Sequence, residues 1–273
     1  MSYWNHYEVI NPAASGVFHK IKAASSYSVG DLNPNFISRQ SFVSSFSADI
    51  EKINSGIGIL YHWKSDIIPK SKAAGLNYAF YFRLNDERKL SLGLSAGFIK
   101  KTMEENILFI SSNDPDDKYD SYSSTDYWNA YGITYATPRL RTGIAARFNL
   151  SEELSVDEEI FNAFFDYKFL LSEKFEIQSG FYAKSRLTPA NLYYDTELER
   201  SYVVNNYILI ILKKRFWFGV IYNHDFAAYI ANNSGLTVGH DIIDKIRLGL
   251  CIYSTHGFSG NFPCEFTASF MLD

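Results

Sequence analysis

The sequence predicts an all-β protein: a single up-and-down antiparallel barrel of about fourteen strands that spans a membrane. Three observations lead to this prediction. Segments of roughly 9 to 14 residues with apolar side chains at every second position follow one another from Val17 to Leu272. The connections between the segments alternate in length, short and then long. Aromatic residues make up 17% of the chain and Pro is scarce, which favours strands over helices.

The alternation of connection lengths separates a membrane barrel from a soluble β-sandwich. A sandwich has no reason to sort its loops, whereas a transmembrane barrel has short periplasmic turns on one side and longer extracellular loops on the other. The longest polar connection covers residues 102–124, and a second long one covers 186–200. The short connections are expected at residues 51–54, 85–88, 137–138, 172–173, 213–214 and 240–244.

The apolar alternation and the connection lengths together predict fourteen strands. An even number is typical of a bacterial barrel with both chain ends on the periplasmic side. No stretch approaches the roughly 18 apolar residues that a membrane helix requires. The expected strands cover residues 17–29, 36–50, 55–64, 71–84, 88–101, 125–136, 139–149, 159–171, 174–186, 200–212, 215–224, 227–239, 245–254 and 263–272.

Alternation also assigns the two faces of each strand. In the strand 71–84, Leu76, Tyr78 and Phe80 share the face that we assign to lipid, and Asn77 and Ala79 share the face that we assign to the lumen. Aromatic residues near strand ends are candidates for interfacial girdles: Trp63, Tyr127, Trp128, Tyr167, Trp217 and Tyr222. Charged residues on the inward series are expected to form ion pairs that fill the lumen: Arg39, Arg83, Arg141, Arg147, Asp166, Lys168, Glu176 and Arg247.

A barrel of fourteen strands is wider than the eight-stranded size that side chains just fill. We therefore expect residues 1–16 to form a plug segment that enters the barrel or crosses its periplasmic mouth, and residues 17–273 to form the barrel itself. Ile10, Asn11, Pro12, Ala13 and Gly16 are the motif residues of this segment.

The composition gives little support for several other classes of protein. The net charge is −4 and the basic residues form no stripe, so no nucleic-acid partner is expected. Cys251 and Cys264 fall on opposite faces of the last two strands, which argues against a disulfide. Neither the histidines nor the acidic runs have the spacing of a metal site, and no glycine-rich phosphate loop occurs. The sequence predicts no catalytic residues, no metal and no cofactor.

Several motifs in order along the chain resemble the PorP/SprF family, outer-membrane proteins of the type IX secretion and gliding machinery of Bacteroidota. The stretch from Ile10 to Gly16 reads I-N-P-A-A-S-G after an aromatic and polar start. Leu84-Asn85-Asp86 leads into the run L-S-L-G-L-S-A-G that begins at Leu90. Asp114-Pro115-Asp116-Asp117 lies in the following long connection. The strand start R-F-W-F-G at Arg215 is also similar to a family pattern.

The resemblance implies a non-enzymatic role in the outer membrane of a Gram-negative bacterium. Members of this family partner and anchor large secreted surface proteins, such as adhesins or other cargo with a type-B C-terminal domain, during export or at the cell surface. The implied contacts are outer-membrane lipid, the cargo protein, and periplasmic secretion-ring or peptidoglycan-linked lipoproteins. Such a location needs a secretory signal, and we expect it to have been removed ahead of Met1.

The long connections are the expected docking surface for such a cargo, because aromatic residues carry most interface hot spots. An outer-membrane channel for small or hydrophobic molecules is the alternative function, in which the charged lumen residues would act as selectivity groups. A barrel-embedded hydrolase would need converging Ser, His and acidic residues at the outer rim, and no such set is evident. The expected partner-binding residues are Phe109, Asp114, Pro115, Asp116, Asp117, Tyr119, Tyr122, Tyr193 and Tyr194.

Overall fold

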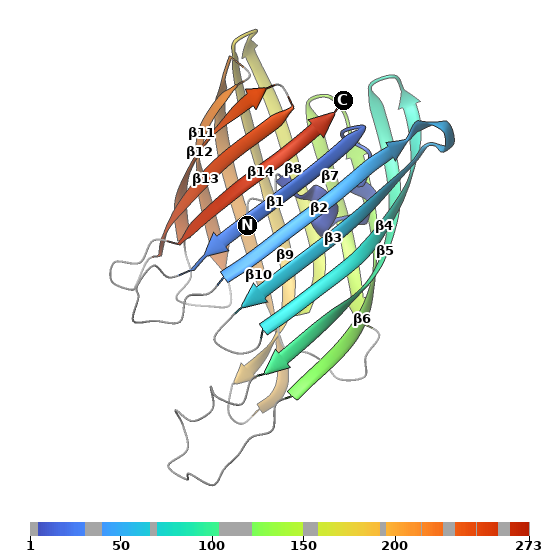
Figure 1. Ribbon diagram of the computed structural model, residues 1–273, viewed down its shortest axis with the longest axis vertical. Helices are drawn as coiled ribbons and strands as arrows, with labels where there is room; N and C mark the ends of the chain where they lie inside the picture. The colour runs from blue at the N-terminus through green and yellow to red at the C-terminus, as the bar shows by residue number, and fades with distance from the viewer. Residues whose placement is uncertain are drawn as a thin grey trace.

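The computed structural model describes residues 5–30, 40–65, 70–103, 122–149, 158–191, 195–213, 215–225, 233–243, 245–255 and 263–272. Fourteen antiparallel strands form a closed barrel in which each strand pairs with its sequence neighbours, and β1 pairs with β14 to close the ring (Figure 1). The predicted fold class is therefore confirmed. Within the part of the chain that the structure describes, no helix is long and apolar enough to cross a membrane.

The short connections all lie at one end of the barrel, which we call the short-turn end, and the other end is called the long-connection end (Figure 1). The strands are β1 Ile21–Val29, β2 Gln40–Ile50, β3 Ser55–Ser65, β4 Lys70–Asn85, β5 Arg88–Met103, β6 Tyr122–Ala136, β7 Leu140–Asn149, β8 Glu158–Ser172, β9 Phe175–Asn191, β10 Asp195–Leu212, β11 Phe216–Asp225, β12 Asn233–Ile243, β13 Ile246–Thr255 and β14 Cys264–Leu272.

Several strand boundaries differ from the sequence-based expectation. β9 continues to Asn191 and β10 begins at Asp195, so the predicted long connection over residues 186–200 is wrong, and only residues 192–194 separate the two strands. β1 begins at Ile21 rather than at Val17, because Val17 and Phe18 pack inside the barrel with Tyr81 instead of joining the sheet. β12 begins at Asn233 and continues to Ile243, so the reversal into β13 is shorter than predicted. The turn between β2 and β3 contains a short 3-10 helix, η3 Glu51–Ile53, which ends at Asn54 in the left-handed region with φ 50°.

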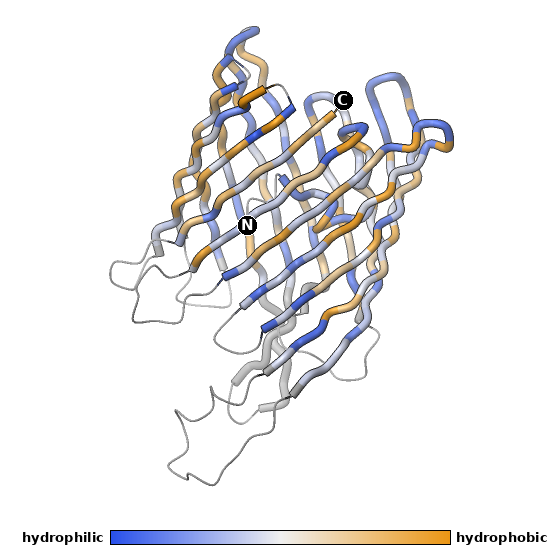
Figure 2. The backbone as a smooth tube through the Cα atoms, in the orientation of Figure 1, coloured by the Kyte–Doolittle hydropathy of each residue, from blue (hydrophilic) through white to orange (hydrophobic). Residues whose placement is uncertain are grey.

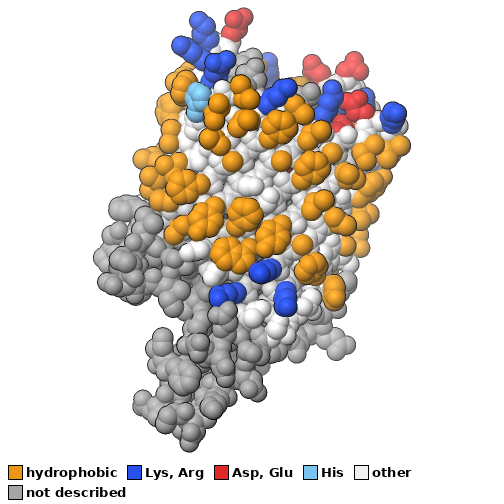
Figure 3. Space-filling view, in the orientation of Figure 1, with side chains coloured by type: hydrophobic (Ala, Val, Ile, Leu, Met, Phe, Trp, Pro, Cys, Tyr) orange, Lys and Arg blue, Asp and Glu red, His pale blue; other side chains and the backbone are white. Residues whose placement is uncertain are grey.

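The outer face of the barrel carries the bulky apolar series. Along β4, the outward Leu76 and Tyr78 are 64% and 41% exposed, whereas the inward Ala79 and Tyr81 are fully buried. Hydropathy alternates along the strands in the same way (Figure 2), and outward side chains form a hydrophobic belt that is bounded by charged residues at the short-turn end (Figure 3). The predicted assignment of faces is confirmed in this strand, and an exposed belt of this size is the surface that lipid covers.

The chain before β1 lies inside the barrel. Residues Tyr7–Ile10 form a single helical turn, α1, and Pro12–Ala14 form a 3-10 turn, η2. Both elements lie within the ring of strands (Figure 1), and nearly every described residue from Asn5 to Val17 is buried. We call residues 5–18 the plug. It runs from the middle of the lumen to the short-turn end, where β1 begins.

Candidate functional site

The motif Asn11-Pro12-Ala13 holds the plug against the barrel wall. The Asn11 side-chain amide donates hydrogen bonds of 3.0 Å to the carbonyl oxygens of Ile133 and Ile144, which are paired residues of β6 and β7. Its side-chain oxygen accepts the Ala13 N–H at 2.9 Å and so caps the 3-10 turn that Pro12 begins. Asn suits this position because it offers a donor to the wall and an acceptor to its own turn.

Glycines on the inward face of four strands allow the plug backbone to approach the wall closely. A Cβ at Gly93 would lie 2.2 Å from the Ala13 nitrogen, and a Cβ at Gly132 would lie 2.0 Å from the Asn11 side-chain oxygen. Distances this short leave no space for any other residue. We call this surface the glycine wall; its residues are Gly56 and Gly58 of β3, Gly93 of β5, Gly132 of β6 and Gly143 of β7.

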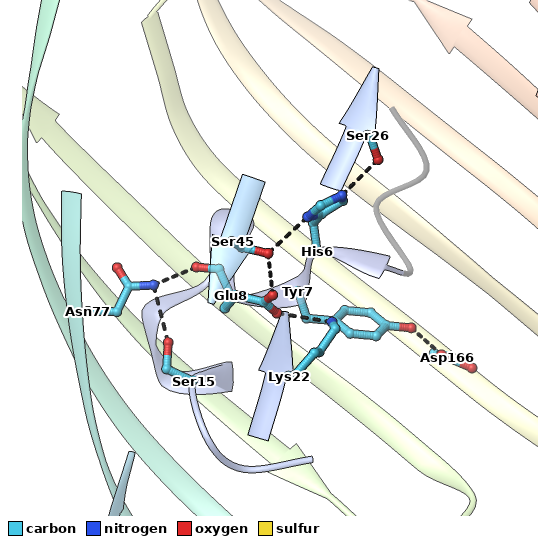
Figure 4. A network of polar contacts seen from close by, with 9 residues as sticks. All are labelled: His6, Tyr7, Glu8, Ser15, Lys22, Ser26, Ser45, Asn77 and Asp166. Atoms are coloured by element: carbon cyan, nitrogen blue, oxygen red, sulfur yellow. Dashed lines mark hydrogen bonds and ion pairs between the residues drawn. The ribbon is translucent and has the colours of Figure 1, made fainter. Parts of the chain in front are cut away.

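A buried polar chain joins the plug to β1 and β2 (Figure 4). Lys22 donates to Glu8 at 3.2 Å, and both side chains are at most 5% exposed. Ser45 donates to the other Glu8 oxygen at 2.6 Å. The His6 ring lies between Ser45, 3.0 Å from Nδ1, and Ser26, 2.7 Å from Nε2. These contacts anchor α1 and its N-cap residue His6 by side chains alone.

The hydrogen bonds fix the tautomer of His6. Because the Ser45 hydroxyl donates to Glu8, it must accept from Nδ1–H of His6, which leaves Nε2 to accept from Ser26. This arrangement needs a neutral imidazole. Burial lowers the pKa of His6 from 6.5 to about 4, so the ring is neutral at physiological pH.

Tyr7 joins the plug to the opposite side of the barrel. Its hydroxyl donates to Asp166 of β8, which also accepts from Gln178 of β9 at 2.7 Å. The Tyr7 ring packs on Phe164 and Phe18, with centroid separations of 5.0 and 5.3 Å. We call the surface that meets the plug through side chains the side-chain wall; its residues are Lys22, Ser26, Ser45, Phe164 and Asp166.

The predicted lumen-filling residues lie in several environments. Arg141 stacks over the Phe18 ring at 4.8 Å, and Arg147 stacks over Trp128 at 4.1 Å. Lys168 pairs with Glu176 at 3.7 Å, and Arg247 pairs with Asp241 at 2.9 Å. Asp166 binds Tyr7, as described above.

Arg83 is a correction to the predicted set. It is exposed near the turn between β4 and β5, where its guanidinium lies 5.8 Å from the Tyr81 ring, so it does not fill the lumen. The strand extends beyond the closed part of the barrel at this point, which parity along the sequence does not reveal. Arg39 falls outside the described residues.

Two of the predicted girdle residues point inward instead. Trp128 lies against Gly75 and Gly97, and Trp217 lies against Gly239 and Gly249, where an added Cβ would meet the indole at 2.1–2.7 Å. Both rings are almost completely buried. Each indole fills the space that two glycines on neighbouring strands leave open. Tyr127 and Tyr222, which are 60% and 46% exposed, remain on the outer face.

Sequence reasoning did not identify the polar anchors Lys22, Ser26 and Ser45 or the glycine wall. The sequence did contain a signal for the glycine wall. Inward positions of β3, β5, β6 and β7 carry glycine, and a lumen lined only by side chains would not require glycine there. Asn77 was assigned to the lumen, and it donates to the Glu8 carbonyl at 2.7 Å and to the Ser15 hydroxyl at 3.2 Å.

The expected partner-binding residues cannot be placed in the structure. Tyr122 begins β6, but its side chain is not described. The others lie outside the described residues: Phe109, Asp114, Pro115, Asp116, Asp117, Tyr119, Tyr193 and Tyr194.

A small cavity lies between the plug and the wall at the level of α1. It has a volume of about 20 Å³ and lies among Glu8, Trp128 and Asn162, which is room for about one water molecule. Cys251 is buried in the lumen and Cys264 lies on the outer side, so they face apart as predicted, and neither forms a disulfide. Among the described residues, no group of three or more His, Cys, Asp or Glu side chains forms a metal site.

A scan against protein families matches residues 1–261 to the model described as Type IX secretion system membrane protein PorP/SprF. No curated protein matches the chain. Among solved structures, the CymD monoaromatic hydrocarbon channel and the P. putida toluene transporter TodX each give a TM-score of 0.54, at 11% and 8% identity. Each match covers 96% of this chain, together with 90% of the CymD chain and 92% of the TodX chain.

The Acinetobacter baumannii outer membrane protein Omp33 gives a TM-score of 0.52 at 10% identity, with 94% of this chain and 100% of that chain covered. These identities are low, and the likeness is one of fold. All three structures are barrels of the outer-membrane kind, in agreement with the closed ring described above.

Proposed function

Because the chain belongs to the PorP/SprF family of type IX secretion system membrane proteins, we propose that it is a closed, non-enzymatic outer-membrane barrel that holds a secreted surface protein during export or at the cell surface. The cargo would be an adhesin or another protein with a type-B C-terminal domain. Periplasmic secretion-ring or peptidoglycan-linked lipoproteins would be further partners at the short-turn end.

One observation supports a closed barrel above the others: the plug backbone lies in direct contact with the glycine wall. Gly56 illustrates the contact, since a Cβ there would lie 1.9 Å from the Ser15 carbonyl oxygen. Bonds from Asn11 to two strands and the buried Glu8–Lys22 pair hold the plug from different directions. A barrel filled in this way serves as a rigid anchor, which leaves the outer connections to bind the cargo.

The cargo would dock on the long connections, and we propose the aromatic and acidic residues of 104–121 as the main contact. Affinity capture of the tagged protein from native membranes, followed by mass spectrometry, tests this. Wild-type protein should recover a large surface protein with a C-terminal secretion domain. A variant with residues 104–121 replaced by a short Gly-Ser linker should lose it, and a variant with changes at Lys52 and Glu87 in the short turns should retain it.

The proposal fails if no such protein is recovered, or if the loop replacement recovers it as well as the wild type does. Conductance in planar bilayers tests the closed state separately. Purified wild-type protein should show no steady current, and a stable open channel would contradict a plugged anchor.

A channel for small or hydrophobic molecules is the second candidate. An apolar depression of about 480 Å³ lies on the outer wall formed by β10–β13, a surface on which a hydrophobic molecule dissolved in the membrane could bind before it crosses the wall. Its lining includes Ile208, Val220 and Leu236, which are 49%, 52% and 69% exposed. These residues alternate with the inward Tyr207, Ile221 and Gly235, so the depression opens toward lipid rather than into the lumen. Uptake of a radiolabelled monoaromatic compound into proteoliposomes would support this candidate over the anchor.

A further inference from the structure

Basic residues occur at an unusual position on the outer wall of the barrel. Lys70 and Lys72 of β4 and Lys100 of β5 are exposed on the lipid-facing side, near the long-connection end. Among the residues whose side chains are described, these are the Lys or Arg residues on lipid-facing positions at that end. Figure 3 shows a small group of basic side chains at the lower edge of the hydrophobic belt, on the face that carries β3 to β5.

Lys72 and Lys100 are directly opposite each other in the register of β4 and β5. Side chains in such a pair have Cβ atoms about 5 Å apart, and like charges at this distance destabilise a sheet. No ion pair from either lysine to another described residue is present in the structure. A bound anion between the two ammonium groups would turn this repulsion into attraction.

The neighbours of the two lysines suit the headgroup of a lipid. The row across the strands reads Trp63, Lys72, Lys100 and Thr125, so an aromatic ring and a hydroxyl flank the charges. Trp at such a position is typical of the boundary between lipid tails and headgroups, and the Thr125 hydroxyl adds a hydrogen-bond donor.

The next row toward the membrane centre suits an acyl chain. It reads Tyr61, Ala74, Phe98 and Tyr127, with the small Ala74 between two exposed rings. Tyr61 is 38% and Phe98 is 43% exposed. This row forms a shallow apolar track that leads directly from the lysine pair into the hydrophobic belt.

We propose that Lys72 and Lys100, flanked by Lys70, bind the phosphate of an acylated glycolipid in the outer leaflet, with an acyl chain over Ala74. Lysine binds phosphate as a compact point charge, and the adjoining apolar track distinguishes a lipid phosphate from a free one. The site is independent of cargo binding. It would fix the rotation and depth of the barrel in the membrane beside the connection that follows β5.

The test compares binding of phosphorylated lipid A with binding of the same lipid A after phosphatase treatment, by native mass spectrometry of the full chain in detergent. The wild type should prefer the phosphorylated form. K72Q/K100Q should bind it roughly 25-fold more weakly, because each lysine near an anionic membrane surface contributes about fivefold. The matched control K52Q/K174Q removes the same charge at the short-turn end and should bind as the wild type does.

Two further measurements keep the test decisive. Without lipid, K72Q/K100Q should unfold at the same temperature as the wild type or at a higher one, because the like-charge pair is relieved. Millimolar inorganic phosphate should fail to displace the glycolipid from the wild type. The proposal is overturned if both forms of lipid A bind the wild type equally, if K72Q/K100Q retains wild-type binding, or if inorganic phosphate displaces the lipid.

Discussion

The plug meets the glycine wall and the side-chain wall in different ways. At the glycine wall, the strand backbone lies directly against the plug, as at Gly93, where no atom could be added without reaching the Ala13 main chain. At the side-chain wall, long polar and aromatic groups reach across the lumen, as in the Glu8–Lys22 pair and the Tyr7–Asp166 bond. The glycine wall therefore sets how closely the plug can approach the strands. The side-chain wall sets which polar and aromatic side chains the plug must carry.

This difference shows how a short segment can be held inside a wide barrel. Fourteen strands enclose more space than their own side chains fill. On one side of the lumen the strands carry glycine, so the plug lies directly against their backbone. On the other side large side chains such as Tyr207 and Trp217 fill the space, and they pack in the same buried cluster as Tyr7. The two walls should consequently respond differently to substitution.

The largest effect is expected from Glu8→Gln on the side-chain wall. This change leaves Lys22 buried without its carboxylate, and breaking a buried ion pair costs about 3–5 kcal/mol. The temperature of unfolding in detergent, followed by circular dichroism, should fall clearly. The double variant E8Q/K22M should recover much of the loss, and equal loss in the single and double variants would show that the pair is not the cause.

The glycine wall should be tested by the pair Gly93→Ala and Gly249→Ala. The added methyl at Gly93 meets plug backbone, so we expect a loss of up to about 3 kcal/mol and a displaced plug. At Gly249 the methyl meets the side chains of Thr267 and Trp217 rather than plug backbone, so the plug should stay in place even though the wall is strained. Thermal unfolding checks the loss at Gly93, and planar-bilayer current should separate the two variants; identical currents would contradict the distinction between the walls.

Asn11→Ala removes the bonds from the plug to β6 and β7 together with the cap of the 3-10 turn. We expect a loss of about 2 kcal/mol from the two wall bonds and the cap. Hydrogen exchange of residues 5–18 should increase in this variant, while exchange in β10–β13 should stay at the wild-type rate. Uniformly faster exchange would indicate a global loss of stability instead.

The smallest effect is expected from mild acid acting on His6. Because its pKa is about 4 in the folded chain and 6.5 in the unfolded one, the unfolded chain binds more protons and stability falls as the pH drops from about 7 toward 4. Between pH 7 and 6 the cost should be below about 1 kcal/mol. A His6→Asn variant should show a flatter dependence of unfolding temperature on pH in this range, and an unchanged slope would exclude His6 as its source.

Much of the fold could be predicted from the sequence because a strand has a period of two. That period placed Leu76 and Tyr78 outside and Asn77 and Ala79 inside, and the lengths of the connections indicated a barrel. The same period misled the prediction at Val17, where alternation continues into a segment that packs inside the barrel. Trp128 and Trp217 were assigned to the girdle because they lie near strand ends, although alternation with the exposed Tyr127 and Phe216 places both indoles inside, against glycines of neighbouring strands.

The site itself was predictable only in part. The sequence by itself determined the strand number, the two faces and the presence of an Asn-Pro-Ala segment ahead of the first strand, because these depend on local period and local turn chemistry. Only the tertiary structure decided that Asn11 would bind Ile133 and Ile144, and that Glu8 would pair with Lys22. Such contacts join inward residues of the plug and the strands, and the closure of the ring brings them together.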